Sequence, residues 1–292
     1  MYDFIVPILL VVFVWWASTA AVLWFSAGSA DSIPGRLMIA TLLAAAGFAA
    51  VIAAPSFEGW YHPLVSFAGA LAVWAWVEFT FLTGLLTGSR TEPCPANISE
   101  WTRFRLAFRT INHHEYTLLA ALIVIGTCDW LASSADTTLW AVAFFGVLWL
   151  MRISAKLTIF SGAPSFGLEM MPAPIAHMKS YFRSDRIGPV FWVSTAVSTG
   201  VLVAGVAAFQ MGLVDPDQRV GTAMLLSLFA LAALEHWMMI LPITDTALWT
   251  WVKPKDDGQK LAVTPRTPVA QKTTSRSVQP TKIIRATGAK PL

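Results

Sequence analysis

Charged residues are scarce in this sequence, and that scarcity excludes an ordinary soluble domain. Asp, Glu, Lys and Arg make up 13% of the 292 residues, whereas 56% are hydrophobic. A soluble globular domain carries about 25% charged residues. Several apolar runs reach the roughly 18 residues that are needed to cross about 30 Å of hydrocarbon. The composition therefore predicts an integral membrane protein whose first partner is the lipid bilayer.

Cysteine is scarce as well, and so are the common catalytic motifs. Cys94 and Cys128 are the two cysteines, and they form neither a disulfide framework nor the spacing of a zinc motif. The sequence has no Gly-rich phosphate loop, no Ser–His–Asp pattern and no nucleic-acid motif, so we expect no nucleic-acid partner. The first apolar run, from about Ile5 to Phe25, lacks a preceding basic region and is too long for a signal peptide. We expect it to be retained.

The hydrophobic runs predict an all-α, polytopic membrane protein with about seven transmembrane helices. A helix is expected in each run because lipid offers no other partners for the backbone of a single apolar segment. The predicted spans are roughly Phe4–Ser26, Leu37–Ala54, Pro63–Leu86, Tyr116–Leu131, Thr138–Thr158, Val190–Leu213 and Gly221–Leu241.

The basic residues predict the orientation of these spans. With seven spans, every Lys and Arg except Arg219 falls on one side of the membrane. Basic residues are enriched in cytoplasmic loops. The sequence therefore predicts a periplasmic N-terminus and a cytoplasmic C-terminus, in a bacterial inner (cytoplasmic or intracytoplasmic) membrane.

Composition divides the chain into a transmembrane helical domain, residues 1–252, and a tail, residues 253–292. The tail is polar and basic and contains several Pro and Thr residues, so it cannot bury a core and we expect it to be disordered. Within the domain, residues 98–115 alternate apolar and basic side chains as an interfacial amphipathic helix does. Residues 160–188, rich in Gly and Pro, are expected to form an ordered cytoplasmic loop with a short helix.

Ionisable residues converge on the cytoplasmic ends of four spans, where they are costly and mark a site by default. Glu78 lies in the third span, and Arg152 and Lys156 close the fifth. The other candidates are His113, His114 and Glu115, which open the fourth span, and Glu235 and His236, which lie late in the seventh.

Three interpretations of this cluster remain open. Carboxylates and imidazoles from three helices suit iron, manganese or zinc, although the Glu-x-x-His spacing of di-iron bundles is absent. A neutral imidazole of His114 or His236 suits the magnesium of bacteriochlorophyll or the iron of haem. The third interpretation is a buried ion-pair network, in which Glu78 or Glu235 pairs with Arg152 or Lys156 and fixes the helix packing.

Four stretches carry a resemblance to a known family. They are RFRLAFRTINHHEY (Arg103 to Tyr116), RISAKLTIF (Arg152 to Phe160), MPAPIAHMKSYF (Met171 to Phe182) and LEHWMMILPITDTALWTW (Leu234 to Trp251). Together they resemble the PuhE family of photosynthetic complex assembly proteins from purple phototrophic bacteria, over about residues 1–252. The polar residues His177 and Asp245 fall within these stretches, and we add them to Arg152 and Lys156 as supporting residues.

The resemblance implies a role in reaction-centre assembly and in modulating bacteriochlorophyll production. It implies no catalytic mechanism. We therefore expect a membrane assembly factor for the reaction-centre and light-harvesting complex, with subunits of that complex or pigment-synthesis enzymes as partners. The alternative is a metal-dependent membrane enzyme that acts on a tetrapyrrole or a lipid. The sequence favours a non-catalytic role and leaves the cofactor, whether metal ion, bacteriochlorophyll or haem, unknown.

Overall fold

The computed structural model describes residues 2–134, 137–166 and 171–241 of the chain. The α-helices in these ranges are α1 (Tyr2–Ser26), α2 (Ile33–Ala53), α3 (Tyr61–Leu82), α4 (Glu100–Ala132), α5 (Trp140–Ser161), α6 (Pro189–Gln210) and α7 (Arg219–Met238). Short 3-10 helices are η1 (Ala30–Ser32), η2 (Ala54–Ser56), η4 (Ala173–Tyr181) and η5 (Pro216–Gln218). Asp245 and the predicted tail lie outside the described residues.

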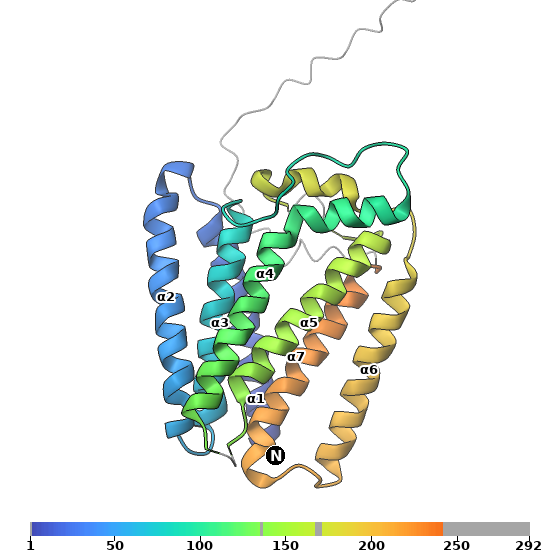
Figure 1. The fold of residues 1–292 in the computed structure, drawn as a ribbon. Helices are drawn as coiled ribbons and strands as arrows, with labels where there is room; N and C mark the ends of the chain where they lie inside the picture. The colour runs from blue at the N-terminus through green and yellow to red at the C-terminus, as the bar shows by residue number, and fades with distance from the viewer. Residues whose placement is uncertain (1, 135–136, 167–170, 242–292) are drawn as a thin grey trace, which may run out of the picture. The chain divides into compact units, whose positions relative to one another are not determined.

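The predicted fold class is confirmed. The described part of the chain is helical, and it contains 7 helices that are long and apolar enough to cross a membrane. Successive helices run in opposite directions, as Figure 1 shows. Consequently α1 begins at one end of the bundle, and the connections from α3 to α4 and from α5 to α6 lie at the other end. The periplasmic and cytoplasmic assignment of these two ends stays a prediction.

The helices α3 and α7 are the most enclosed. In their apolar windows, 56% and 61% of the residues are buried, against 17% for α1 and α6. The core between the helices is aromatic and aliphatic, with Phe67, Leu118, Phe144 and Met224 among its fully enclosed side chains. Charged groups on α3 and α7 are therefore held at the centre of the bundle.

Helices α2 and α3 approach each other through a glycine pair. A Cβ atom built at Gly69 would lie 2.7 Å from the carbonyl oxygen of Gly47, and one built at Gly47 would lie 2.8 Å from that of Gly69. Both distances are shorter than a Cβ atom tolerates. The close backbone contact thus depends on small residues, as is common between membrane helices.

Helix α4 begins well before the predicted fourth span. Ser99 caps it, because its hydroxyl accepts a hydrogen bond from the Thr102 amide at 3.2 Å. The helix then continues without a break to Ala132, so that the amphipathic segment and the span form one element. Its first turns run across the end of the bundle beside η4 (Figure 1). The position of this segment at a membrane surface stays a prediction.

Candidate functional site

An ion pair joins helices α3 and α5. Glu78 is 6% exposed on α3, and its Oε2 accepts a hydrogen bond from Arg152 Nη2 at 3.2 Å. The side chain of Arg152 is 42% exposed, against 8% for that of Glu78. The carboxylate is thus the deeply buried partner, and the guanidinium keeps access to neighbouring space.

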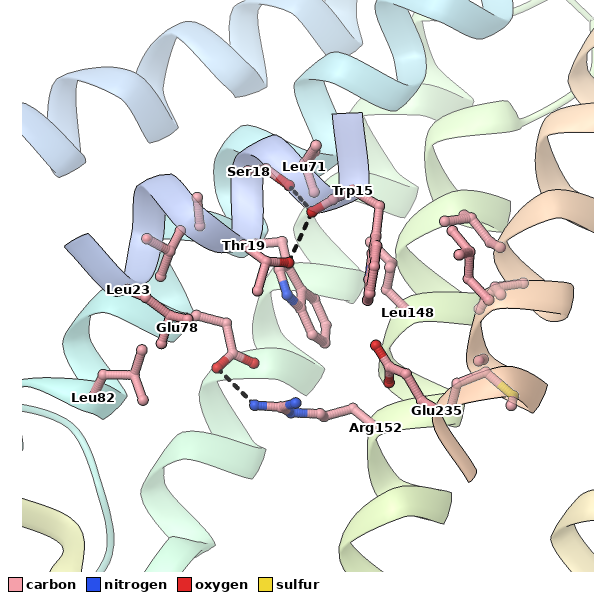
Figure 2. A pocket seen from close by; sticks show the side chains of 18 residues that line it. Trp15, Ser18, Thr19, Leu23, Leu71, Glu78, Leu82, Leu148, Arg152 and Glu235 are labelled. Carbon is pink, nitrogen blue, oxygen red and sulfur yellow. Dashed lines mark hydrogen bonds and ion pairs between the residues drawn. The ribbon is translucent and has the colours of Figure 1, made fainter. Parts of the chain in front are cut away.

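That space is a cavity of about 260 Å³ between α1, α3, α5 and α7. Figure 2 shows Glu78, Arg152 and Glu235 facing it, with Ser18 and Thr19 on the α1 side. Three carboxylates, those of Glu78, Glu235 and Glu115, lie within electrostatic reach of Arg152. Glu78 Oε1 is buried and has no hydrogen-bond partner among the described residues. Of these groups, Glu78, Glu235 and Arg152 line the cavity, whereas Glu115 does not. Two carboxylates and one guanidinium therefore face the same space.

A second ion pair joins α4 to α5. Lys156 Nζ donates to Glu115 Oε1 at 2.5 Å, and the indole nitrogen of Trp149 donates to Glu115 Oε2 at 3.1 Å. Both oxygens of this buried carboxylate are satisfied. The Glu78–Arg152 pair is one that the ion-pair interpretation of the sequence named. The Glu115–Lys156 pair is not, because that interpretation gave Lys156 to Glu78 or Glu235.

His236 serves the packing of α7 against α5. Its Nδ1 lies 2.7 Å from the carbonyl oxygen of Ala232, and its Nε2 lies 2.9 Å from the hydroxyl of Ser154. A carbonyl oxygen only accepts, so Nδ1 carries the proton and Nε2 accepts from Ser154. Both ring nitrogens are therefore used within the protein.

His114 presents the opposite case. Its side chain is fully buried, and in the described part of the chain neither ring nitrogen has a hydrogen-bond partner. Its ring packs on Phe81 with the centroids 4.3 Å apart. His113 is exposed, because neighbouring residues on a helix point about 100° apart. Of the adjacent histidines, only His114 turns inward.

The candidate residues do not assemble into a metal site. Among residues 2–134, 137–166 and 171–241, no three His, Cys, Asp or Glu side chains are grouped closely enough to hold a metal ion. The ion pairs explain the separation, because Glu78 and Glu115 each face a cation on α5. The metal hypothesis thus finds no donor set in this region.

Sequence reasoning missed Arg103, which connects the start of α4 to η4 and to the last turn of α5. Its guanidinium donates to the carbonyl oxygens of Tyr181 at 2.5 Å and Phe160 at 3.1 Å, and it also pairs with Glu100. It lies 3.8 Å from the centre of the Phe160 ring. An arginine in an amphipathic pattern is expected to face solvent, so the sequence contains no signal for this role.

Asp129 was missed too, because an acidic residue near a span end resembles a surface residue. It is fully buried at the other end of the bundle. Its Oδ2 accepts a hydrogen bond from the Val142 amide at 3.2 Å. Asp129 therefore satisfies a free amide in the first turn of α5, where a negative charge is also favourable.

The supporting residue His177 lies on η4 and takes part in none of the ion pairs of the described residues. Burial lowers the pKa of His177, while hydrogen bonds with the backbones of Arg90 and Pro174 oppose the shift. Because its pKa falls below the ordinary value of 6.5, its imidazole is neutral at pH 7. His177 thus adds no charge to the end of the bundle.

Fold and site together define an all-helical, multi-pass membrane protein. Its ion pairs Glu78–Arg152 and Glu115–Lys156, which we call the charged network, lie near one end of the bundle. The chain belongs to the family described as "Protein of unknown function (DUF3623)", which matches residues 1–260. It is 34% identical over 275 residues to the "Uncharacterized 30.4 kDa protein in puhA 5'region" of Rhodobacter capsulatus, covering 89% of this chain and 96% of that protein. No solved structure matches the chain significantly.

Proposed function

We propose that the protein is an inner-membrane assembly factor for the photosynthetic reaction-centre and light-harvesting complex, and that it modulates bacteriochlorophyll supply. The observation that carries the proposal is the similarity to the Rhodobacter capsulatus protein, which is named for its position in the 5′ region of puhA, together with the resemblance of four sequence stretches to photosynthetic complex assembly proteins. That similarity extends over most of both chains. It therefore applies to the whole membrane domain.

The geometry of the charged network supports a binding role. Glu78–Arg152, Glu115–Lys156 and His236–Ser154 connect α3, α4 and α7 to α5. Side chains that are engaged with one another stabilise a fixed arrangement of helices. Such an arrangement suits a scaffold that holds a pigment or a nascent subunit near the cytoplasmic face.

Of the two inward-facing histidines, His114 and His236, we assign His114 as the residue that ligates a pigment. Its two buried ring nitrogens have no partner within the described ranges, whereas those of His236 are engaged. A neutral imidazole suits the magnesium of bacteriochlorophyll or the iron of haem. For the metal-dependent enzyme that the sequence left as an alternative, no specific observation provides support.

Complementation of a gene deletion tests this proposal. A phototroph that lacks the gene should accumulate less reaction-centre and light-harvesting complex, which is measured as near-infrared absorbance of its membranes. The wild-type gene and the control Glu58→Gln, an exposed position, should restore it. We expect His114→Phe, made at wild-type protein level, to restore it incompletely. A deletion strain with normal absorbance would contradict the assembly role itself.

A further inference from the structure

A second, larger cavity lies on the outer side of α4 and α5, under η4. Its volume is about 490 Å³, within the range of about 300–1,000 Å³ typical of ligand pockets. Its lining is dominated by aromatic and aliphatic side chains, among them Phe104, Phe108, Leu119, Trp149, Phe160 and Met178. We call this cavity the α4–α5 cleft.

The α4–α5 cleft opens on the lateral surface of the bundle. Among its hydrophobic lining residues, Phe108 (39%), Tyr116 (56%), Leu119 (42%) and Leu157 (36%) are exposed. Phe108 and Tyr116 form one edge, with their ring centroids 6.2 Å apart. A chain-like apolar molecule in the bilayer can therefore enter from the side without crossing a polar layer.

Two arginines flank this edge on α4. Phe104, Phe108 and Ile111 recur at helical spacing and line the cleft. Arg105 and Arg109 lie on the adjacent stripe of the same helix, which reaches Tyr116 at the edge of the cleft. Both arginines are exposed. Their charges therefore lie beside the opening.

The two cations that line the cleft are already paired, Lys156 with Glu115 and Arg152 with Glu78. On α4, Arg103 pairs with Glu100. By contrast, no ion pair involves Arg105 or Arg109 within the described part of the chain. Unpaired positive charge on α4 thus lies where the apolar cleft opens.

We propose that the α4–α5 cleft binds an anionic phospholipid, with an acyl chain along the aromatic lining and the phosphate on Arg105 and Arg109. Guanidinium groups bind phosphate through paired, charge-assisted hydrogen bonds. Basic pockets beside membrane helices on the cytoplasmic side select anionic lipid head groups. This assignment is independent of the role in photosynthesis, because it rests on the cleft and its charges alone.

The test uses the full-length protein in detergent and native mass spectrometry. The probes are dioleoyl-phosphatidylglycerol and dioleoyl-phosphatidylcholine, which share acyl chains and differ in head-group charge. We expect wild-type protein to retain the anionic lipid preferentially. The double variant Arg105→Gln and Arg109→Gln should bind it roughly 10- to 30-fold more weakly, since each basic residue contributes about 1 kcal/mol to such binding.

Two further variants separate the head-group site from the cleft and from general charge. The matched double variant Arg186→Gln and Arg219→Gln removes the same charge elsewhere and should keep the preference. Ala107→Phe fills the cleft and should weaken binding of both lipids. Equal binding of the two lipids by the wild type would overturn the proposal. An unchanged preference after Arg105 and Arg109 are replaced would also overturn it, and would leave the cleft to an uncharged molecule or a helix of a partner protein.

Discussion

At the level of single residues, Arg152 is the side chain on which the charged network depends. It pairs directly with Glu78 and lies within electrostatic reach of Glu235 and Glu115. Removing a carboxylate leaves the guanidinium with the other two. Removing the guanidinium leaves the buried Glu78 carboxylate without its cation in a region of low dielectric. Loss of Arg152 is therefore expected to lower the stability of the protein more than loss of Glu78.

We predict that Arg152→Gln destabilises the protein more than Glu78→Gln does. Loss of a buried ion-pair partner costs about 3–5 kcal/mol, and loss of an exposed one about 0–1 kcal/mol. Because the Arg152 side chain is 42% exposed, we expect about 2 kcal/mol for Arg152→Gln. Thermal and denaturant unfolding in detergent measures it, with Glu58→Gln as the control. The double variant should be less destabilised than the sum of the single variants, and strict additivity would show that the pair is not coupled.

Several individual roles could be predicted from the sequence, and others could not. The pairing of a span carboxylate with Arg152 follows from the cost of an isolated charge in a membrane. The choice of Glu78 over Glu235, and the inward position of His114 rather than His113, depend on how each helix is rotated about its axis. Packing against neighbouring helices sets that rotation, and one sequence does not specify it.

At the level of helices, the close contact between α2 and α3 limits side-chain size at both of its glycines. The backbone of each helix occupies the position of a Cβ atom on the other, at Gly47 and Gly69. A backbone atom cannot move aside as the end of a flexible side chain can. Any larger residue must therefore push the helices apart.

We predict that Gly69→Ala destabilises the protein by about 1–3 kcal/mol, the usual cost of overpacking. The control is Gly146→Ala on α5, where a new Cβ atom meets nothing within 4 Å. There the higher helix propensity of alanine should give a gain of up to about 1 kcal/mol. Equal melting temperatures of the two variants in detergent would show that α2 and α3 are not in such close contact.

The number of helices was predictable, because apolar length gives all seven spans within the described residues and an apolar segment in lipid must satisfy its own backbone as a helix. Hydropathy alone would start the fourth helix at Tyr116. The amphipathic pattern of residues 98–115 predicts a helix before that point, and α4 begins at Glu100, where Ser99 caps it. The structure joins the two segments in one continuous helix.

At the level of the whole molecule, charge is distributed unevenly along the bundle. The Glu78–Arg152 and Glu115–Lys156 pairs lie near the end of the bundle that carries the α3–α4 and α5–α6 connections. The hydrogen bonds of Arg103 to Tyr181 and Phe160 lie at the same end. The proposed assembly role uses this end as its binding face. The α4–α5 cleft beside it would place anionic lipid next to the same face.

Affinity purification of the full-length protein from its native phototroph tests the assembly role most directly. A tag on the chain, mild detergent and quantitative mass spectrometry would compare the captured proteins with those captured by an unrelated tagged membrane protein of similar abundance. We predict several-fold enrichment of reaction-centre or light-harvesting subunits, or of pigment-synthesis enzymes, with bacteriochlorophyll in the absorption spectrum if pigment is delivered with them. Capture of none of these above the control, from cells that are assembling photosynthetic complexes, would contradict the account.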